Sequence, residues 1–87
     1  MIRLSMVFGM MDDLVKRVRK WGYEVFNDGY CSIGYYIYLK ERPENLVERS
    51  ICLMRLFEGE GFDLGCLEIE AKFSPIEEYS FIGVLVR

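Results

Sequence analysis

The segment from Tyr30 to Lys40 has the clearest strand pattern in this chain of 87 residues. Its odd positions form an apolar series: Cys31, Ile33, Tyr35, Ile37 and Leu39. Its even positions are small or carry a tyrosine: Tyr30, Ser32, Gly34, Tyr36 and Tyr38. Because successive side chains of a strand point to opposite faces, the pattern predicts one face in the core and one partly exposed to solvent. We therefore expect a sheet at the centre of the fold.

Four other segments also have strand character. Residues 2–8 alternate, with Ile2, Leu4, Met6 and Phe8 on one side, and residues 66–73 alternate before the break at Ser74-Pro75. Residues 23–26 form a short candidate strand, and Asn27-Asp28-Gly29 after it favours a tight hairpin turn into the Tyr30–Lys40 strand. The last run, 80–87, is apolar on both faces, which predicts a strand inside the sheet or under a partner.

Two segments have helical spacing. The first has apolar residues at Met11, Leu14, Val15, Val18 and Trp21. Asp12 and Asp13 are expected at its N-terminus, and Gly22 at its end. The second follows Pro43 and ends at Gly59 and Gly61. Its expected apolar side consists of Leu46, Val47, Ile51, Leu53, Met54 and Phe57.

The expected order of elements is strand, helix, strand, strand, helix, strand, strand. Its first six elements match the βαββαβ order of a ferredoxin-like domain, with one extra C-terminal strand. We therefore predict a single α+β domain over residues 1–87. It is a two-layer sandwich with two helices on one face of a mainly antiparallel sheet of four or five strands.

The composition favours self-association and disfavours general binding of polyanions. Hydrophobic residues make up 52% of the chain and aromatic residues 15%, so part of the apolar surface is expected to meet another subunit, most simply in a homodimer. The net charge is −3, whereas affinity for nucleic acid depends on an excess of Lys and Arg.

The three cysteines indicate a reducing compartment. Cys31, Cys52 and Cys66 form neither a CxxC pair nor a disulfide framework, and each falls in an apolar segment. We expect reduced, mostly buried thiols in a cytoplasmic protein. No stretch of the sequence is long and apolar enough to span a membrane.

The candidate binding surface is the partly exposed face of the sheet. We expect it to present Tyr30, Tyr36 and Tyr38, with Arg3, Glu68 and Glu70 setting the alignment of a partner. Tyrosines suit an interface because the ring supplies contact area and the hydroxyl forms hydrogen bonds. The alternative is an ordinary solvated face with cross-strand aromatic pairs. Gly34 leaves a hollow on this face that another backbone or a ligand could approach, and a bulge would explain it equally well.

A second hypothesis is nucleic-acid binding through the basic group of the first helix and the tyrosines. That group consists of Lys16, Arg17, Arg19 and Lys20. Its simpler explanation is that basic side chains near a helix C-terminus complement the helix dipole.

Catalysis has little support in the sequence. The chain has no histidine, so the usual base at neutral pH is missing. Glu68 and Glu70, with Asp63 nearby, could hold Mg²⁺, but alternating glutamates on an exposed strand usually increase solubility. We predict a small non-enzymatic binding or assembly module without metal or cofactor. It self-associates through the tyrosine-rich sheet face or a sheet edge, and such a surface could also bind another protein partner.

Overall fold

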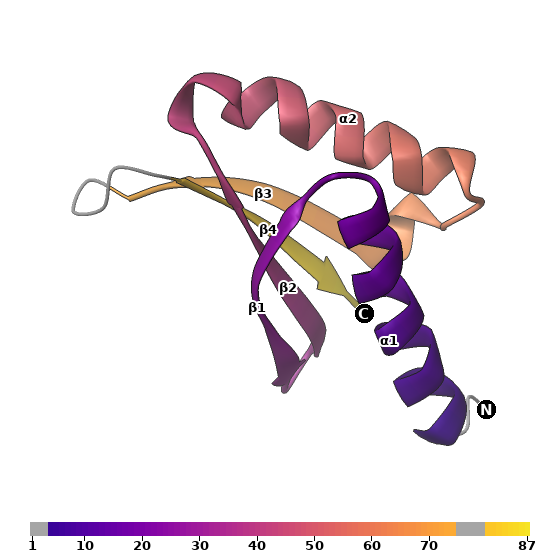
Figure 1. Ribbon diagram of the computed structural model, residues 1–87. Helices are drawn as coiled ribbons and strands as arrows, with labels where there is room; N and C mark the ends of the chain where they lie inside the picture. Colours follow the sequence, from indigo (N-terminus) through magenta and orange to yellow (C-terminus); the bar gives the residue numbers. More distant parts are fainter. Residues whose placement is uncertain (1–3, 75–79) are drawn as a thin grey trace.

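A computed structural model describes residues 4–74 and 80–87, with side chains described from residue 12 onward. It contains two helices and an antiparallel sheet of four strands (Figure 1). The elements follow one another as α1 (Leu4–Lys20), β1 (Glu24–Cys31), β2 (Gly34–Glu41), α2 (Leu46–Gly59), β3 (Leu67–Phe73) and β4 (Ser80–Val86). Short 3-10 turns at Pro43–Asn45 and Leu64–Cys66 precede α2 and β3. The predicted α+β class is confirmed.

The strands lie in the order β1-β2-β4-β3, and each neighbouring pair is antiparallel. The two central strands are therefore β2 and β4, and β1 and β3 form the edges. The prediction that the last apolar run lies inside the sheet is confirmed, because β4 pairs with β2 on one side and β3 on the other. Five of its seven residues are buried, as expected for a strand that is apolar on both faces.

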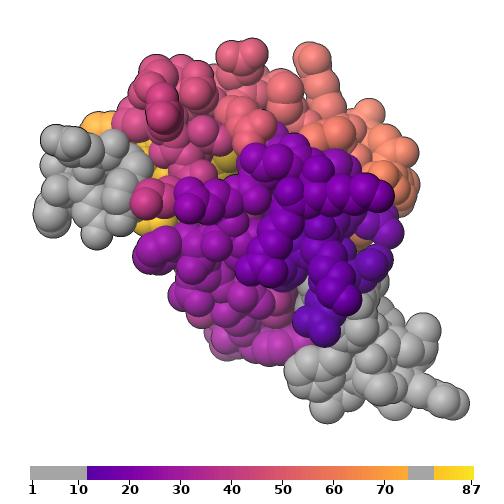
Figure 2. All heavy atoms as spheres, in the orientation of Figure 1, coloured from indigo at the N-terminus to yellow at the C-terminus, as the bar shows by residue number. Residues whose placement is uncertain are grey.

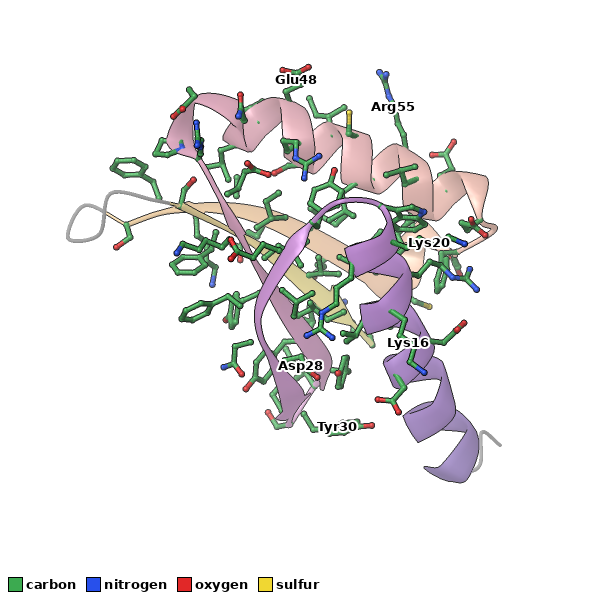
Figure 3. All side chains as sticks on the ribbon, in the orientation of Figure 1. Lys16, Lys20, Asp28, Tyr30, Glu48 and Arg55 are labelled. Carbon is green, nitrogen blue, oxygen red and sulfur yellow. The ribbon has the colours of Figure 1, made fainter. Side chains whose placement is uncertain are left out.

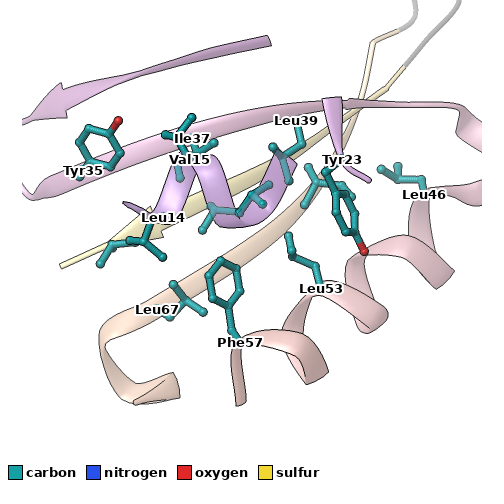
Figure 4. Packing of buried hydrophobic residues seen from close by; sticks show 14 residues of the cluster. Leu14, Val15, Tyr23, Tyr35, Ile37, Leu39, Leu46, Leu53, Phe57 and Leu67 are labelled. Carbon is teal, nitrogen blue, oxygen red and sulfur yellow. The ribbon is translucent and has the colours of Figure 1, made fainter. Parts of the chain in front are cut away.

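The core lies between one face of the sheet and the two helices (Figure 4). Tyr35, Ile37 and Leu39 on β2 lie opposite Val86, Val84 and Ile82 on β4, and all six are buried. The helices cover them with Leu14, Val15 and Val18 from α1 and Leu46, Leu53 and Phe57 from α2. In Figure 2, α1 from residue 12 onward and β1 fill the side of the molecule turned to the viewer, and α2 forms its upper rim.

The predicted strand over residues 2–8 is wrong from Leu4 onward, because these residues begin α1. The alternating pattern was ambiguous: Leu4, Phe8, Met11, Val15 and Val18 also follow the three- and four-residue spacing of a helix. One helix of 17 residues continues this spacing without a break. Asp12 and Asp13 consequently lie in the middle of α1 and not at its N-terminus. The ferredoxin-like βαββαβ order is not confirmed, since the described elements run α, β, β, α, β, β.

The predicted hairpin turn is also displaced. Asn27, Asp28 and Gly29 lie inside β1, and the chain turns at Ser32 and Ile33. The register of β1 against β2 shifts between Val25 and Asn27, which marks a bulge. The new turn removes Cys31 and Ile33 from the expected core face, and Ile33 is 62% exposed.

Candidate binding surface

The helices leave one face of the sheet uncovered by any described element, and we call this the open face. The strand register aligns Asn27, Tyr38, Gly83 and Glu70 across it in one row. Tyr36, Leu85 and Glu68 form the row on one side, and Lys40, Phe81 and Lys72 the row on the other. The structure thus brings together Tyr36, Tyr38, Glu68 and Glu70 as the sequence predicted.

A shallow hollow of about 410 Å³ lies in the middle of the open face. Gly83 is one of its lining residues, and a Cβ there would lie 3.4 Å from the Tyr38 ring, so the glycine lets the tyrosine lie close to the sheet. The rings of Tyr36 and Tyr38 are 5.3 Å apart, at a tilt of 48°. The remaining lining comes from Cys31 and Ile33 at the β1–β2 turn, Glu68, Glu70 and Lys72 on the edge strand β3, and Val84 and Leu85 on the central strand β4. This is a surface that can accept flat or apolar groups from a partner.

The charged groups of the open face are paired within the chain. The Nζ of Lys72 lies 3.7 Å from a Glu70 carboxylate oxygen and 5.4 Å from the centre of the Tyr38 ring. Glu68 forms an ion pair with Arg87. All four of these charged side chains are substantially exposed, so each pair adds little to the stability of the isolated chain. They remain able to form new pairs with a partner.

Phe26 and Phe81 extend the aromatic surface beyond what the sequence predicted. Phe26 is 58% exposed, and its ring centre lies 5.0 Å from that of Phe81. Together with Asn27, Tyr38 and Lys72 they line a second hollow of about 310 Å³. Both Phe26 and Asn27 line it because the bulge interrupts alternation in β1. No local pattern marks that bulge, whereas Phe81 could be placed from the alternation of β4.

Tyr30 lies on the other face of the sheet. It pairs with Tyr35, whose side chain is buried under the helices, and the two rings are 4.9 Å apart. Figure 3 shows Tyr30 at the end of β1 on the side of α1. Arg3 lies outside the described residues. Of the six residues predicted for the interface, four therefore share the open face.

The basic residues of α1 are separated from the open-face tyrosines. Arg17 bonds to Asp13 at 3.0 Å and to Glu60 at 3.1 Å. Lys16 and Lys20 line a hollow of about 550 Å³ with these two acids and Trp21, on the helix side of the molecule (Figure 3). Arg19 is exposed on the same helix. Nucleic-acid binding by Lys16, Arg17, Arg19 and Lys20 together with Tyr36 and Tyr38 thus stays a prediction that this placement does not favour.

A network of hydrogen bonds fixes α2 over the sheet. Arg49 donates to Glu41 at 2.7 Å and to the carbonyl of Gly22 at 2.9 Å, and the Ser80 hydroxyl donates to the Glu41 carbonyl at 3.0 Å. The hydrogen bond with Glu41 raises the pKa of Arg49 above its usual value. Tyr23 belongs to the same network, because its hydroxyl donates to the Arg49 carbonyl at 2.7 Å, and burial raises the pKa of Tyr23. Each of these polar groups has a hydrogen-bond partner within the fold, and together they tie α2 to the end of β2 and to the turn after α1.

The expectation of buried thiols is wrong: Cys31, Cys52 and Cys66 are all exposed and unpaired with one another. Cys31 lies next to the turn, Cys52 on the outer part of α2, and Cys66 in a 3-10 turn before β3. Apolar neighbours in sequence misled the prediction, because none of these positions points into the core. Among the residues described, no group of three or more Cys, Asp or Glu side chains is placed to hold a metal ion.

A second uncovered surface runs along the outer edge of β3. Only its first apolar position, Leu67, is buried, whereas Ala71 and Phe73 are exposed. The apolar side predicted for α2 is likewise only partly buried. Leu46, Leu53 and Phe57 face the core, but Val47, Ile51 and Met54 are exposed, and we call these three residues the α2 flank.

Comparisons with known proteins give no family, relative or fold neighbour: no family model, curated protein or solved structure matches this chain. In the described ranges, neither helix has the length and apolar character needed to cross a membrane.

Proposed function

We propose that this chain is a small non-enzymatic binding and assembly module that self-associates through the uncovered part of its sheet. One observation carries the proposal: both helices lie on one face, and they leave a tyrosine-bearing face and the adjoining edge of β3 without a cover in the described part of the chain. In this proposal the chain forms a homodimer through the tyrosine-bearing face or the sheet edge, and whichever of the two surfaces the dimer leaves uncovered can bind a further protein partner.

The amount of exposed apolar surface supports the proposal. Several large apolar side chains are more than half exposed: Phe26, Ile33, Val47 and Phe73. Single exposed apolar residues are common, but Ile33 and Phe26 line the two hollows of the open face together with Tyr38, and apolar surface gathered beside a hollow is typical of interaction sites. Tyr36 and Tyr38 add rigid aromatic area, and the charged rows beside them can set the orientation of a partner.

The chemistry of the side chains supports binding over catalysis. The sequence has no histidine, and Tyr23, Tyr35 and Arg49, whose pKa values are raised, hold hydrogen bonds within the fold. The three exposed cysteines fit a reducing compartment such as the cytoplasm, where unpaired surface thiols persist.

The test is solution mass by light scattering over a series of protein concentrations. We expect the native chain to be dimeric at high concentration. A double variant, Tyr36→Ala with Tyr38→Ala, shows whether the open face takes part, and Tyr30→Ala is the matched control because this tyrosine lies on the helix face. A native chain that stays monomeric at every concentration would contradict the proposal.

A further inference from the structure

The outer edge of β3 is the more accessible of the two sheet edges. β3 keeps a regular register with β4 over all seven of its residues, and no segment in the described ranges pairs with its other side. The edge of β1, in contrast, is interrupted by the bulge between Val25 and Asn27. Bulges hinder the pairing of an edge with another strand, whereas a regular edge presents a row of backbone donors and acceptors.

The α2 flank lies on the same side of the molecule as this edge. α2 packs on β3 and β4, and Arg49 on one side of the helix reaches back to Gly22 and Tyr23 near β1. At 100° per residue, Val47, Ile51 and Met54 project roughly opposite to Arg49 and hence toward the β3 edge. Glu48 and Arg55 lie between these two sides and point away from the sheet (Figure 3).

The N-terminal end of α2 and the C-terminal end of β3 lie at the same end of the molecule. The register aligns Glu41 at the end of β2 with Ser80 and Phe73, and α2 begins shortly after Glu41. Val47, in the first turn of α2, is therefore at the same end of the molecule as Phe73. Phe73 is 63% exposed and Val47 68% exposed. An apolar strip thus accompanies the free edge on the helix side of the sheet.

The sequence of β3 is complementary to itself in one antiparallel register. With a two-fold axis at Ala71, Glu70 of each strand faces Lys72 of the other on the open face. On the helix side, Ile69 faces Phe73, and the two small Ala71 residues meet at the axis. Opposite charges and apolar pairs across neighbouring strands both stabilise such pairing.

The neighbouring antiparallel registers of two β3 strands place like charges opposite each other. An axis at Glu70 places the two Glu70 side chains opposite each other, and an axis at Ile69 places Glu68 opposite Glu70. An axis at Lys72 brings the two lysines together. Like charges directly opposite are destabilising, so the mixed charges of β3 resist other pairings while favouring the register at Ala71.

We propose that the partner of the β3 edge is a second copy of this chain, paired antiparallel about Ala71. This joins two four-stranded sheets into one of eight strands, and it brings the two α2 flanks and the exposed Phe73 residues toward each other. The existing Lys72–Glu70 ion pairs of the two copies then form an alternating group of four charges. The inference rests on the self-association proposed above and specifies its interface.

Charge exchange tests this register. Glu70→Lys and Lys72→Glu each replace two opposite-charge pairs by two like-charge pairs, so each variant alone is expected to have its dimer dissociation constant raised about tenfold or more. Mixing the two variants restores both pairs and is expected to give a heterodimer of near-native affinity. The chain with both substitutions is expected to dimerise like the native protein. Sedimentation velocity measures all four samples, and circular dichroism checks that each is folded.

Glu68→Lys is the matched control, because it changes the net charge as Glu70→Lys does but faces Ser74 in the proposed register. Glu68→Lys should leave the dissociation constant of the dimer almost unchanged. If the two-fold axis were at Glu70 instead, Glu68→Lys would weaken the dimer as much as Lys72→Glu.

Single variants Glu70→Lys and Lys72→Glu that dimerise like the native chain, or a mixture of the two that does not recover native affinity, overturn the inference. If these variants have no effect but Tyr36→Ala with Tyr38→Ala abolishes the dimer, self-association stands and the edge register is wrong. A native chain that is always monomeric overturns both proposals.

Discussion

The Tyr23 hydroxyl donates a 2.7 Å hydrogen bond to the backbone carbonyl of Arg49, whose guanidinium carbon lies 3.9 Å from the centre of the Tyr23 ring. Tyr23 follows the turn after α1, and Arg49 belongs to the first turns of α2, so the pair ties the chain after α1 to α2. Figure 4 shows the Tyr23 hydroxyl directed at α2. Tyr23→Phe removes the hydrogen bond but keeps the ring. We expect it to lower the free energy of unfolding by about 1 kcal/mol, measured by urea titration.

Tyr36→Phe is the control for this prediction, because its hydroxyl lies on the open face. It should change the free energy of unfolding by less than about 0.5 kcal/mol. Both measurements belong at one low protein concentration, since self-association adds to apparent stability. Equal losses in the two variants would contradict a specific role for the Tyr23 bond.

We expect Tyr35 to make the free energy of unfolding depend on pH in the alkaline range. Burial, and then the hydrogen bond that its hydroxyl donates to Asp28, raise the pKa of Tyr35 well above the ordinary value near 10. Below pH 10 the tyrosine is protonated in both states, so its contribution is fully present. Above pH 10 the unfolded chain loses this proton first, and the free energy of unfolding falls by up to about 1.4 kcal/mol per pH unit.

The pH dependence is checked by urea unfolding between pH 9 and pH 11 for the native chain and Tyr35→Phe. The variant is expected to be less stable at pH 8 and to lose less stability between pH 10 and pH 11. Parallel curves for the two proteins would show that Tyr35 does not titrate in the expected way. The same pH series for Tyr23→Phe provides a second variant to compare with the native chain, because burial also raises the pKa of Tyr23.

Phe57 and its neighbour Leu56 should differ sharply in their effect on stability. Phe57 is fully buried, with edge-to-face contacts to Trp21 at 5.2 Å and Phe62 at 5.3 Å between ring centres. Phe57→Ala is expected to cost about 3–5 kcal/mol because it leaves a cavity in the core. Leu56 is exposed, so Leu56→Ala should cost less than about 1 kcal/mol. Thermal unfolding followed by circular dichroism separates the two, and similar losses would contradict the assignment of the buried side of α2.

Gly34 and Gly59 should respond oppositely to alanine. Gly34 has φ of +154°, and a Cβ there would collide with the backbone carbonyl of Val86, so Gly34→Ala is expected to destabilise by about 1–3 kcal/mol. Gly59 ends α2, and a Cβ added to it would meet no described atom within 4 Å, so Gly59→Ala should stabilise by about 0.5–1 kcal/mol. Urea unfolding of both variants is the measurement. A tolerated alanine at residue 34 would show that the close approach of β2 and Val86 can relax.

The open-face site was partly predictable. Tyr36, Tyr38, Glu68 and Glu70 were placed together because alternation within β2 and β3 assigns each residue to a face. Tyr30 was assigned to the wrong face because the chain turns at Ser32 and Ile33 and not at residues 27–29. This later turn places Tyr30 on β1, opposite Tyr35. Phe26 was missed because its exposure on the open face depends on a bulge that leaves no local signal.

The sequence by itself determined the elements whose hydrophobic period is unambiguous: the part of the Tyr30–Lys40 strand that forms β2, from Gly34 onward, the apolar interior strand β4 and the two helical stretches ending near Gly22 and Gly61. This information is local, since a period of two or of 3.6 residues reflects only the geometry of one element. Tertiary structure decided whether residues 4–8 continue a helix, where the first hairpin turns, and which apolar residues are covered. Leu67 and Phe73 share one face of β3, yet only Leu67 is buried, because burial depends on where another element lies and not on the alternation itself.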